Sequence, residues 1–277
     1  MFQIKAKLLY NKRVKENYFH CALEAPRIAL KASPGQFVNV RVTDDLEPFL
    51  RRPFGIHRVR GKTIEILYEV LGKGTEMLSL KKAGEYLDII GPLGNGFNTE
   101  PRTPNLELFI LVAGGMGVAP LVFLSEKLEE IPNPKSQIPN KVFIGAKTKN
   151  QILCEEEFKK SGLDVYVSTD DGSKGFRGKV TGLLKAFLRD NETARQRTTI
   201  CACGPRPMLK EIALISSQYH IPAQISLEEH MACGIGACLG CVVNTQDGYK
   251  RVCKEGPVFS ADAIIWANFQ GRKIMEN

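Results

Sequence analysis

The hydrophobic pattern of this sequence changes its period near residue 106. In the first hundred residues, short apolar stretches are separated by Pro and Gly, which is typical of the strands of a small antiparallel barrel. After 106, continuous apolar stretches such as LELFILVAGG alternate with stretches of helical period such as APLVFLSEKLEE. Strands that alternate with helices predict a parallel sheet covered on both faces. We therefore expect a multidomain fold, part antiparallel β and part α/β.

Polar segments that contain proline divide the chain into three expected units. With 277 residues, of which 43% are hydrophobic, the chain can bury more than one core. Candidate boundaries fall at 98–105 and 220–224. We expect a barrel over 1–100, an α/β domain over 101–222 and a cysteine-rich domain over 223–277. This last unit is too small to rely on hydrophobic burial alone.

The composition favours a cytoplasmic protein. No apolar run reaches about 18 residues, and the amino-terminal stretch lacks the features of a signal peptide, so no membrane association is expected. In a reducing compartment, clustered cysteines are better explained as metal ligands or redox groups than as disulfides. The formal charge of +8 is spread over the sequence without an aromatic-interleaved basic face, so nucleic-acid binding is not expected.

Four of the eight cysteines lie close together near the carboxyl end. Cys233, Cys238 and Cys241 have the spacing C-x4-C-x2-C, and eleven residues separate Cys241 from Cys253. This spacing begins like the plant-type pattern of a 2Fe-2S cluster. Structural zinc sites commonly use two paired knuckles, whereas this segment has one CxxC pair. An iron-sulfur cluster is the preferred interpretation, and a zinc-stapled scaffold without catalytic activity is the alternative.

Two strand ends in the expected parallel sheet carry turn motifs. In LVAGGMGVAPL, at 111–121, glycines separate a buried strand from a helix, where free amides can hold a pyrophosphate. In CACGPRPML, at 201–209, a second strand ends before another helix. Two such turns form a crevice for a nucleotide, although Cys203 is equally well explained as a buried thiol. The candidate nucleotide contacts are Gly114, Gly115, Gly117, Cys203, Gly204 and Pro205.

A third motif lies in the expected barrel. The stretch RRPFGI, at 51–56, places an arginine beside a proline-stiffened strand, where its planar guanidinium can meet a phosphate. The stretch LYEVLGKGT, at 67–75, offers backbone amides and a hydroxyl to the same group. Taken alone, such a hairpin is more often a solvated strand than a ligand site.

In this order, the barrel motif, the glycine turn and the CGP strand end resemble the ferredoxin-NADP reductase superfamily. The resemblance covers about the first 220 residues and implies that FAD binds on the barrel and a nicotinamide nucleotide on the parallel sheet. The superfamily usually has Ser or Thr where this chain has Gly55, so a hydroxyl near the flavin is absent. The FAD contacts that the resemblance implies are Arg52, Pro53, Phe54, Gly55, Leu67, Tyr68, Glu69, Gly74 and Thr75.

Two further stretches, STDDGSKGFRGKVTGLL and SLEEHMACGIGACLGCVVNTQDGYKRVCKEGPVF, are similar to the electron-transfer subunits of type B dihydroorotate dehydrogenases. This resemblance spans nearly the whole chain. It implies one FAD and one 2Fe-2S cluster, ligated by Cys233, Cys238, Cys241 and Cys253. It also implies a heterotetramer of two such chains and two FMN-bearing catalytic subunits, in pyrimidine biosynthesis. His230 stands where relatives often have arginine, and it is assigned no role.

The implied route takes electrons from dihydroorotate, at the partner's FMN, through the cluster and FAD to NAD+. No residue of this chain need act as a strong acid or base. Similar subunits serve sulfide dehydrogenase, NADH-dependent ferredoxin:NADP oxidoreductase and hydrogenase. In the first two, Asp often occupies the position of the first cluster ligand, so Cys233 favours dihydroorotate dehydrogenase. A hydrogenase-type partner stays open.

The preference for NAD over NADP depends on one loop. Asp170 and Asp171 lie where an adenine ribose is expected, and carboxylates there disfavour a 2'-phosphate. Lys174 and Arg177 would reverse this preference if they reached the ribose. The sequence therefore favours NAD.

Overall fold

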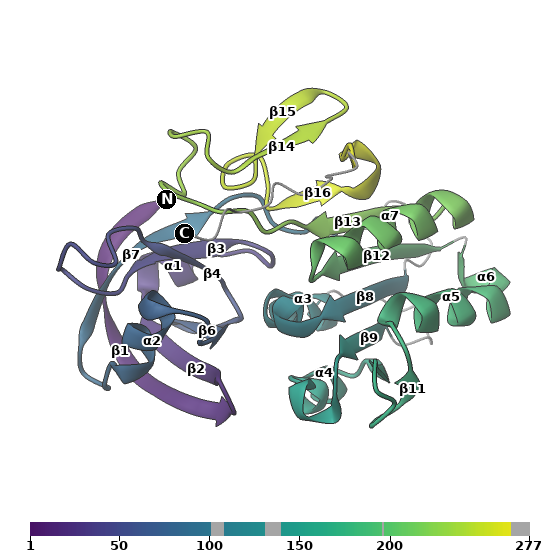
Figure 1. Cartoon of the computed structure of the whole chain (residues 1–277), viewed down its shortest axis with the longest axis horizontal. Helices are drawn as coiled ribbons and strands as arrows, with labels where there is room; N and C mark the ends of the chain where they lie inside the picture. Colours follow the sequence, from purple (N-terminus) through teal and green to yellow (C-terminus); the bar gives the residue numbers. More distant parts are fainter. Residues whose placement is uncertain (101–107, 131–139, 196, 267–277) are drawn as a thin grey trace, which may run out of the picture.

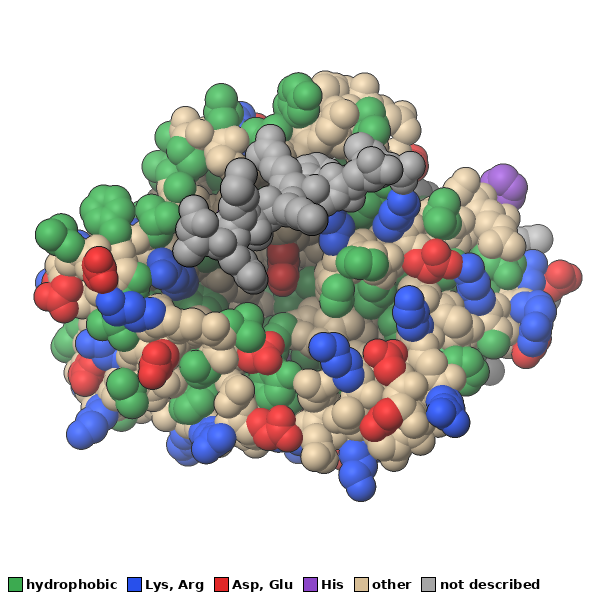
Figure 2. All heavy atoms as spheres, in the orientation of Figure 1, with side chains coloured by type: hydrophobic (Ala, Val, Ile, Leu, Met, Phe, Trp, Pro, Cys, Tyr) green, Lys and Arg blue, Asp and Glu red, His purple; other side chains and the backbone are tan. Residues whose placement is uncertain are grey.

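The computed structural model describes residues 1–100, 108–130, 140–195 and 197–266. Two β-sheet bodies lie side by side, and a small hairpin lies above them (Figure 1). In the part of the chain that is described, no helix has the length and apolar character needed to cross a bilayer. On the face shown in Figure 2, the basic side chains of the described residues are interspersed with acidic ones.

The amino-terminal body is an antiparallel sheet of seven strands in the order β4-β3-β7-β1-β2-β6-β5. Alternate residues of β1 point inward, and Ala6 and Leu8 are fully buried in the core. This alternation is what the sequence of the first hundred residues predicts, and the antiparallel barrel is confirmed. Its elements are β1 (Phe2–Lys15), β2 (Tyr18–Glu24), α1 (Pro26–Ala29), β3 (Phe37–Arg41), β4 (Arg52–Gly55), β5 (Arg58–Arg60), β6 (Thr63–Glu69), α2 (Lys73–Leu80) and β7 (Tyr86–Leu93).

The second body is a sheet in the order β11-β10-β9-β8-β12-β13-β16, parallel except for β16. Its elements are β8 (Leu108–Gly114), α3 (Val118–Glu129), β9 (Lys141–Ala146), α4 (Glu155–Lys160), β10 (Asp164–Thr169), β11 (Phe176–Arg177), α5 (Val180–Asp190), α6 (Glu192–Arg195), β12 (Thr198–Cys203), α7 (Arg206–Tyr219), β13 (Ala223–Ser226) and β16 (Val258–Ser260).

Helices cover both faces of this second sheet, as expected for a buried parallel sheet. All seven residues of β8 are buried. Ile110 packs on the side of α5 and α7, and Leu111, the next residue, packs on the side of α3 and α4. Because successive side chains of a strand point to opposite faces, a strand covered on both sides has to be apolar throughout. The predicted α/β domain is confirmed.

The cysteine-rich segment lies between two strands of the second sheet. β13 pairs with β12, and β16 returns to pair with β13. Between them, β14 (Val242–Thr245) and β15 (Gly248–Arg251) form a two-stranded hairpin. The expected boundary between residues 222 and 223 therefore falls directly before a strand that continues the parallel sheet. The expected boundary at 98–105 lies mostly outside the described residues.

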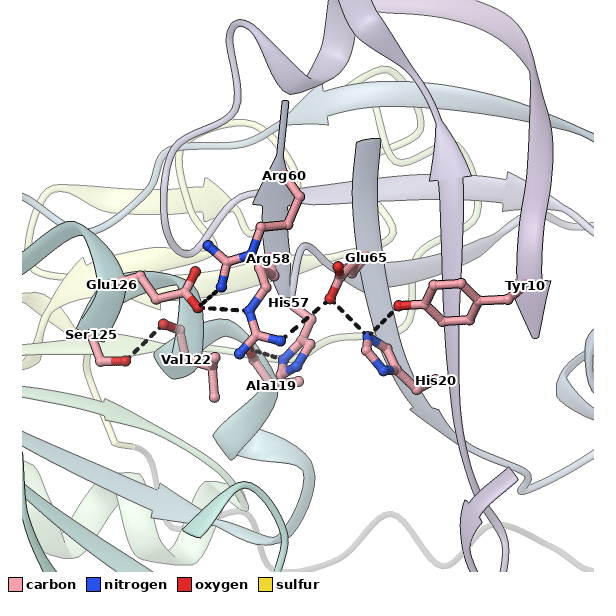
Figure 3. Close-up of polar contacts among 10 residues, drawn as sticks. All are labelled: Tyr10, His20, His57, Arg58, Arg60, Glu65, Ala119, Val122, Ser125 and Glu126. Carbon is pink, nitrogen blue, oxygen red and sulfur yellow. Dashed lines mark hydrogen bonds and ion pairs between the residues drawn. The ribbon is translucent and has the colours of Figure 1, made fainter. Parts of the chain in front are cut away.

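Ion pairs join the barrel to α3 (Figure 3). The Nε atom of Arg58 in β5 donates a hydrogen bond to Oε1 of Glu126 over 2.7 Å, and Nη2 of Arg60 reaches the same oxygen over 2.6 Å. The side chains of Arg58 and Glu126 are only 15% and 14% exposed. Because little water reaches this pair, it is less screened than an ordinary surface ion pair. The contact holds α3 in a fixed position against the barrel.

A histidine completes this junction. His57, only 2% exposed, has its Nδ1 atom 2.9 Å from the carbonyl oxygen of Ala119 in α3, so Nδ1 carries the proton. Potential metal-ligand atoms of His57, His20 and Glu65 lie within 4.8 Å of one another. Glu65, however, already accepts hydrogen bonds from His20 over 3.0 Å and from Arg58 over 3.5 Å. The network is satisfied by these contacts and needs no cation.

We expect acid to destabilise the fold through His57. Burial lowers the pKa of His57 to about 3, against about 6.5 in an unfolded chain. Since the folded-state pKa is the lower one, the unfolded chain binds the proton first. The contribution of His57 to stability is fully present above about pH 6.5 and is lost as the pH falls towards 3. The loss amounts to about 2 kcal/mol between pH 6.5 and pH 5.

Urea unfolding of the wild type and of His57→Gln over this pH range measures the effect. Glutamine can still donate to Ala119 but does not titrate, so the variant should lose this part of the pH slope. His20, Glu65 and Arg58 face His57 in both proteins and contribute equally to the remainder. The exposed His230 provides the control, His230→Gln, which should keep the wild-type slope. Equal slopes in the wild type and His57→Gln would contradict the prediction.

Candidate functional site

A pocket of about 350 Å³ lies where the barrel meets the α/β sheet. Strands β4 and β6 form its barrel side, and the rings of Phe54 and Tyr68 lie 5.6 Å apart within it. Most of its walls are apolar, as is usual for a site that buries an organic cofactor. Eight of the nine predicted FAD contacts line this pocket: Arg52, Pro53, Phe54, Gly55, Leu67, Tyr68, Glu69 and Thr75.

The ninth predicted contact, Gly74, lies in the first turn of helix α2 and lets this turn approach the side chain of Arg52. α2 begins at Lys73, and the amides of its first turn have no acceptor within the helix. A Cβ atom on Gly74 would come within 2.5 Å of Nε of Arg52, so only glycine allows this approach. A guanidinium group and a helix N-terminus both bind phosphate oxygens. The residues present therefore fit the phosphates of FAD at this end of the pocket.

The hydroxyl of Thr75 has a different task from the one expected. Its Oγ1 atom accepts hydrogen bonds from the amides of Leu71, over 2.9 Å, and Gly72, over 3.2 Å, and donates to the carbonyl of Gly72 over 3.0 Å. These three bonds close the turn before α2. In this arrangement the hydroxyl holds the turn, and the backbone amides at the start of α2 are the donors left for an anion.

Sequence reasoning missed much of the opposite wall of this pocket. Most of its residues come from the start of α3 and from residues 226–231, and the glycine and cysteine motifs there did not mark them as flavin contacts. Gly55 faces this wall. A Cβ atom added to Gly55 would lie 3.8 Å from Pro120, which is a normal van der Waals distance, so the fold leaves room for a Cβ atom here. The residues missed are Gly35, Phe37, Leu71, Met116, Ala119, Pro120, Ser226, Leu227, Glu228, Glu229, Met231 and Pro257.

Cys203 also lines this first pocket, which we call the flavin pocket. It does not line the second pocket, at the carboxyl ends of the parallel strands, which we call the nucleotide pocket. It ends β12 and is 3% exposed. Burial raises its pKa well above the usual range, so the side chain is a neutral thiol. The carbonyl oxygen of Cys203 touches the glycine turn after β8, where a Cβ atom on Gly117 would fall 1.9 Å away. Gly117 thus allows the two strand ends to pack together, and it does not line either of the two pockets.

A second pocket, of about 630 Å³, lies at the carboxyl ends of β8, β9, β10 and β12. This is where nucleotides bind in open parallel sheets. Of the predicted nucleotide contacts, Gly114, Gly115, Asp170 and Pro205 line it, whereas Gly204 does not. Glu69, at the end of β6, lines both pockets, so the two sites adjoin there.

The charges around the second pocket are mixed. Asp170 lines it, but the carboxylate of Asp171 accepts hydrogen bonds from the amide and hydroxyl of Ser173, over 2.9 and 2.6 Å. Lys174 forms an ion pair with Glu155 and lies outside the pocket lining. The basic residues that do line the pocket are Lys147 and Lys179, which sequence reasoning missed.

The cysteine loop aims backbone amides at sulfur. Sγ of Cys233 accepts hydrogen bonds from the amides of Ile235, Ala237 and Cys238, over 3.5, 3.3 and 3.4 Å. Burial opposes ionisation of this thiol, but these amide donors outweigh it and lower the pKa of Cys233 to about 6. A metal-ligating cysteine has to be a thiolate, so the loop prepares this sulfur for ligation.

The four thiols of this segment lie as two pairs. The side chain of Cys233 interacts with that of Cys238, and the side chain of Cys253 interacts with that of Cys241. Among the described residues, no three cysteines bring their sulfur atoms within 4.8 Å of one another. A single tetrahedral zinc ion would need all four sulfurs about 3.8 Å apart. Two separate pairs fit two irons bridged by sulfide.

Comparisons with known proteins agree with this geometry. Residues 228–265 match the model of the iron-sulfur cluster binding domain of dihydroorotate dehydrogenase B. Residues 111–213 match the model of the oxidoreductase NAD-binding domain.

Relatives of similar length carry one shared name. A protein of Desulforamulus reducens, named dihydroorotate dehydrogenase B (NAD(+)), electron transfer subunit, is 43% identical over 94% of this chain and 97% of its own length. A protein of the same name from Caldanaerobacter subterraneus is 36% identical over 96% and 99%.

Two solved structures show the same architecture. A structure of NADH-dependent reduced ferredoxin-NADP oxidoreductase superposes with a TM-score of 0.82 and 29% identity, over 95% of this chain and 90% of that one. A ferredoxin-NADP+ reductase of Neisseria gonorrhoeae, with bound FAD and NADP, has a TM-score of 0.63 at 15% identity, over 79% and 90%. The second likeness concerns the fold alone.

Proposed function

The chain belongs to the family of dihydroorotate dehydrogenase B electron transfer subunits, and from this premise we propose that it passes electrons from an FMN-bearing catalytic subunit, where dihydroorotate is oxidised, to NAD+. This activity belongs to pyrimidine biosynthesis. We further propose an assembly of two such chains with two catalytic subunits, in the cytoplasm, where reducing conditions suit thiolate-bound iron.

The order of the three sites along the molecule carries this proposal. Glu69 belongs to both the nucleotide pocket and the flavin pocket. On the other side, Pro257 lines the flavin pocket and lies four residues after Cys253, the last of the four clustered cysteines. Met231 also lines the flavin pocket, two residues before the first cysteine of the loop. The flavin pocket thus lies between the nucleotide pocket and the cluster loop, which is the order that electron transfer between NAD(H) and the cluster requires.

The chain's own residues bind and position these groups. FAD, when bound, links the two-electron chemistry of nicotinamide to the one-electron chemistry of the cluster. Arg52 and the start of α2 hold the FAD phosphates in this proposal, and the strand residues around Phe54 and Tyr68 enclose its ring. The neutral thiol of Cys203 adds no charge to the wall of the pocket. Cys233, Cys238, Cys241 and Cys253 ligate the two irons.

We also propose NAD as the nucleotide. Asp170 is the carboxylate of its loop that lines the nucleotide pocket, and Lys174, which would favour a 2'-phosphate, is held by Glu155. Lys147 and Lys179 lie in the same pocket and can bind the pyrophosphate, which both nucleotides carry.

A second candidate is a subunit that serves an NADH-dependent ferredoxin:NADP oxidoreductase. The TM-score of 0.82 with such a structure favours it. Cys233 argues against it, since those subunits often have Asp at the first ligand position. The two candidates share the cofactors of this chain and differ in the partner.

The purified chain is expected to contain FAD and about two irons and two sulfides per molecule, and to oxidise NADH with an artificial acceptor. It should not oxidise dihydroorotate, because no FMN site belongs to the proposed role of this chain. Isolation from native cells should bring down an FMN protein that restores dihydroorotate-dependent NAD+ reduction. Dihydroorotate turnover by the chain alone, or recovery with a ferredoxin-linked partner instead, would overturn the proposal.

A further inference from the structure

Asn39 of the barrel holds the backbone of the first cluster ligand. It lies in β3, is completely buried, and donates a hydrogen bond from Nδ2 to the carbonyl oxygen of Cys233 over 3.1 Å. This bond joins the barrel to a loop 194 residues later in the sequence. The carbonyl acceptor requires the amide nitrogen of Asn39, and not its oxygen, to face the loop.

The position of Asn39 in the sheet places it next to the flavin-binding strand. In the pairing of β3 with β4, Asn39 lies opposite Pro53, and Val38 lies opposite Phe54. Both Pro53 and Phe54 line the flavin pocket. One residue of β3 therefore contacts the cluster loop with its side chain while its backbone pairs with a wall of the flavin pocket.

The loop is shaped to receive Asn39. Gly234 follows Cys233 with a φ of +69°, which few residues other than glycine adopt. A Cβ atom on Gly234 would fall 2.4 Å from Nδ2 of Asn39. Because the next amides of the loop donate to Sγ of Cys233, a shift of the 233–234 peptide would also move the donors that surround this sulfur.

Folding stability does not explain an asparagine at this place. Its Oδ1 atom is buried and has no hydrogen-bond partner among the described residues. A buried polar atom without a partner costs free energy, and an apolar side chain of the same size would avoid that cost. An apolar side chain, however, could not donate a hydrogen bond to the carbonyl oxygen of Cys233.

We propose that Asn39 is a positioning residue that fixes the Cys233 and Cys238 half of the cluster site against the flavin-binding strand, and so sets the rate of electron transfer between flavin and cluster. This inference rests on the proposed function, since it needs both groups to be bound. Asn39 acts through Cys233 and contacts neither cofactor pocket itself.

The test compares Asn39→Leu with Asn95→Leu. Leucine has the same branched shape and number of heavy atoms as asparagine, and it removes the hydrogen bond. Asn95 is a matched control, because its Nδ2 atom also donates to a backbone carbonyl of the carboxyl-terminal segment, that of Glu255, over 3.0 Å. It is exposed and holds no ligand residue.

Three measurements are made on the full chain carrying FAD and the cluster. Hydrogen exchange reports how often the amides of Ile235, Ala237 and Cys238 open. Anaerobic stopped-flow with NADH reports flavin reduction and then cluster reduction, from their separate absorbance changes. Electron paramagnetic resonance of the reduced cluster reports its surroundings.

In Asn39→Leu we expect exchange of these amides to be faster on the order of fivefold, the effect of one lost hydrogen bond. We expect cluster reduction to be at least about tenfold slower relative to flavin reduction, with an altered resonance spectrum. Asn95→Leu should match the wild type in all three. Unchanged exchange, an unchanged ratio of the two rates, or the same changes in Asn95→Leu would overturn the inference. A wild-type chain without iron would instead refute the proposed function, and the exchange comparison would still decide whether Asn39 fixes the loop.

Discussion

Replacing Cys238 with alanine is expected to remove iron and sulfide from the chain while FAD stays bound. Cys238 supplies one of the two sulfurs of the first pair, so its loss leaves one iron with a single cysteine. Its side chain is exposed, and alanine keeps the backbone amide that donates to Cys233, so the fold should be unaffected. Iron should fall from about two per chain to near zero.

Cys238→Ala should affect the step from flavin to cluster and leave the step from NADH to flavin intact. Electron delivery from NADH to a one-electron partner should fall by more than about 100-fold, since weaker changes around a metal already cost 10- to 100-fold. NADH oxidation with an artificial acceptor that reacts at the flavin should persist. Metal analysis, the flavin absorbance and the two rates measure this. Cys154→Ala is the matched control, because Cys154 is also a free cysteine but lies at the start of α4, outside the cluster loop.

Two results would contradict this account. Full iron content in Cys238→Ala would mean that another residue ligates the metal. Zinc in place of iron in the wild type would support the alternative of a zinc-stapled scaffold, against the two separate thiol pairs that the structure contains.

The α/β domain could be predicted largely because its hydrophobic patterns are continuous within each strand and helix. The buried run of β8 and the amphipathic α5 are readable from sequence, since burial on two faces and on one face leave different patterns. β13 has only four residues, too few for a period, so its place in the parallel sheet could not be predicted. The short helix α2 was not expected for the same reason, and with it the capping role of Thr75 was missed.

The candidate site was predictable where its chemistry depends on spacing. The cysteine pattern works because a cluster constrains four residues that lie within one segment. The wall of the flavin pocket formed by Pro120, Ser226 and Met231 could not be predicted, because Pro120 lies far in the sequence from Ser226 and Met231, and all three are apolar or small. The same is true of the bond from Asn39 to Cys233, which only the docking of loop on barrel creates.

Sequence alone also could not distinguish two adjacent arginines by their contacts, and the structure assigns them different tasks. Arg51 donates from Nη1 to the carbonyl of Asp88 over 2.8 Å, and its Nη2 lies 3.0 Å from Oδ1 of the same residue, so it ties the residue before β4 to β7. Arg52 makes no ion pair among the described residues; its Nη1 atom donates a hydrogen bond to the carbonyl of Leu50, and its Nε atom lies against the start of α2 at the flavin pocket. The first arginine stabilises the barrel through a carboxylate, whereas the second has no carboxylate partner among the described residues and keeps its positive charge for a phosphate.

Arg52→Ala is therefore expected to weaken FAD binding on the order of 100-fold, because a charge-assisted, planar contact with a phosphate is lost. Titration of the flavin-free chain with FAD, followed by flavin fluorescence, measures the dissociation constant. Urea unfolding of the flavin-free protein should change little, since Arg52 holds no other part of the barrel by an ion pair.

Arg51→Ala is the matched control, with the opposite outcome. Its loss should lower the free energy of unfolding by about 1 to 2 kcal/mol, because the half-buried carboxylate of Asp88 is left with weaker partners. The affinity for FAD should stay within about twofold of the wild type, a change smaller than one neutral hydrogen bond. If Arg51→Ala lost FAD while Arg52→Ala kept it, the phosphate site would have to lie on the other side of β4, away from α2. The proposal that Arg52 and the start of α2 hold the FAD phosphates would then be overturned.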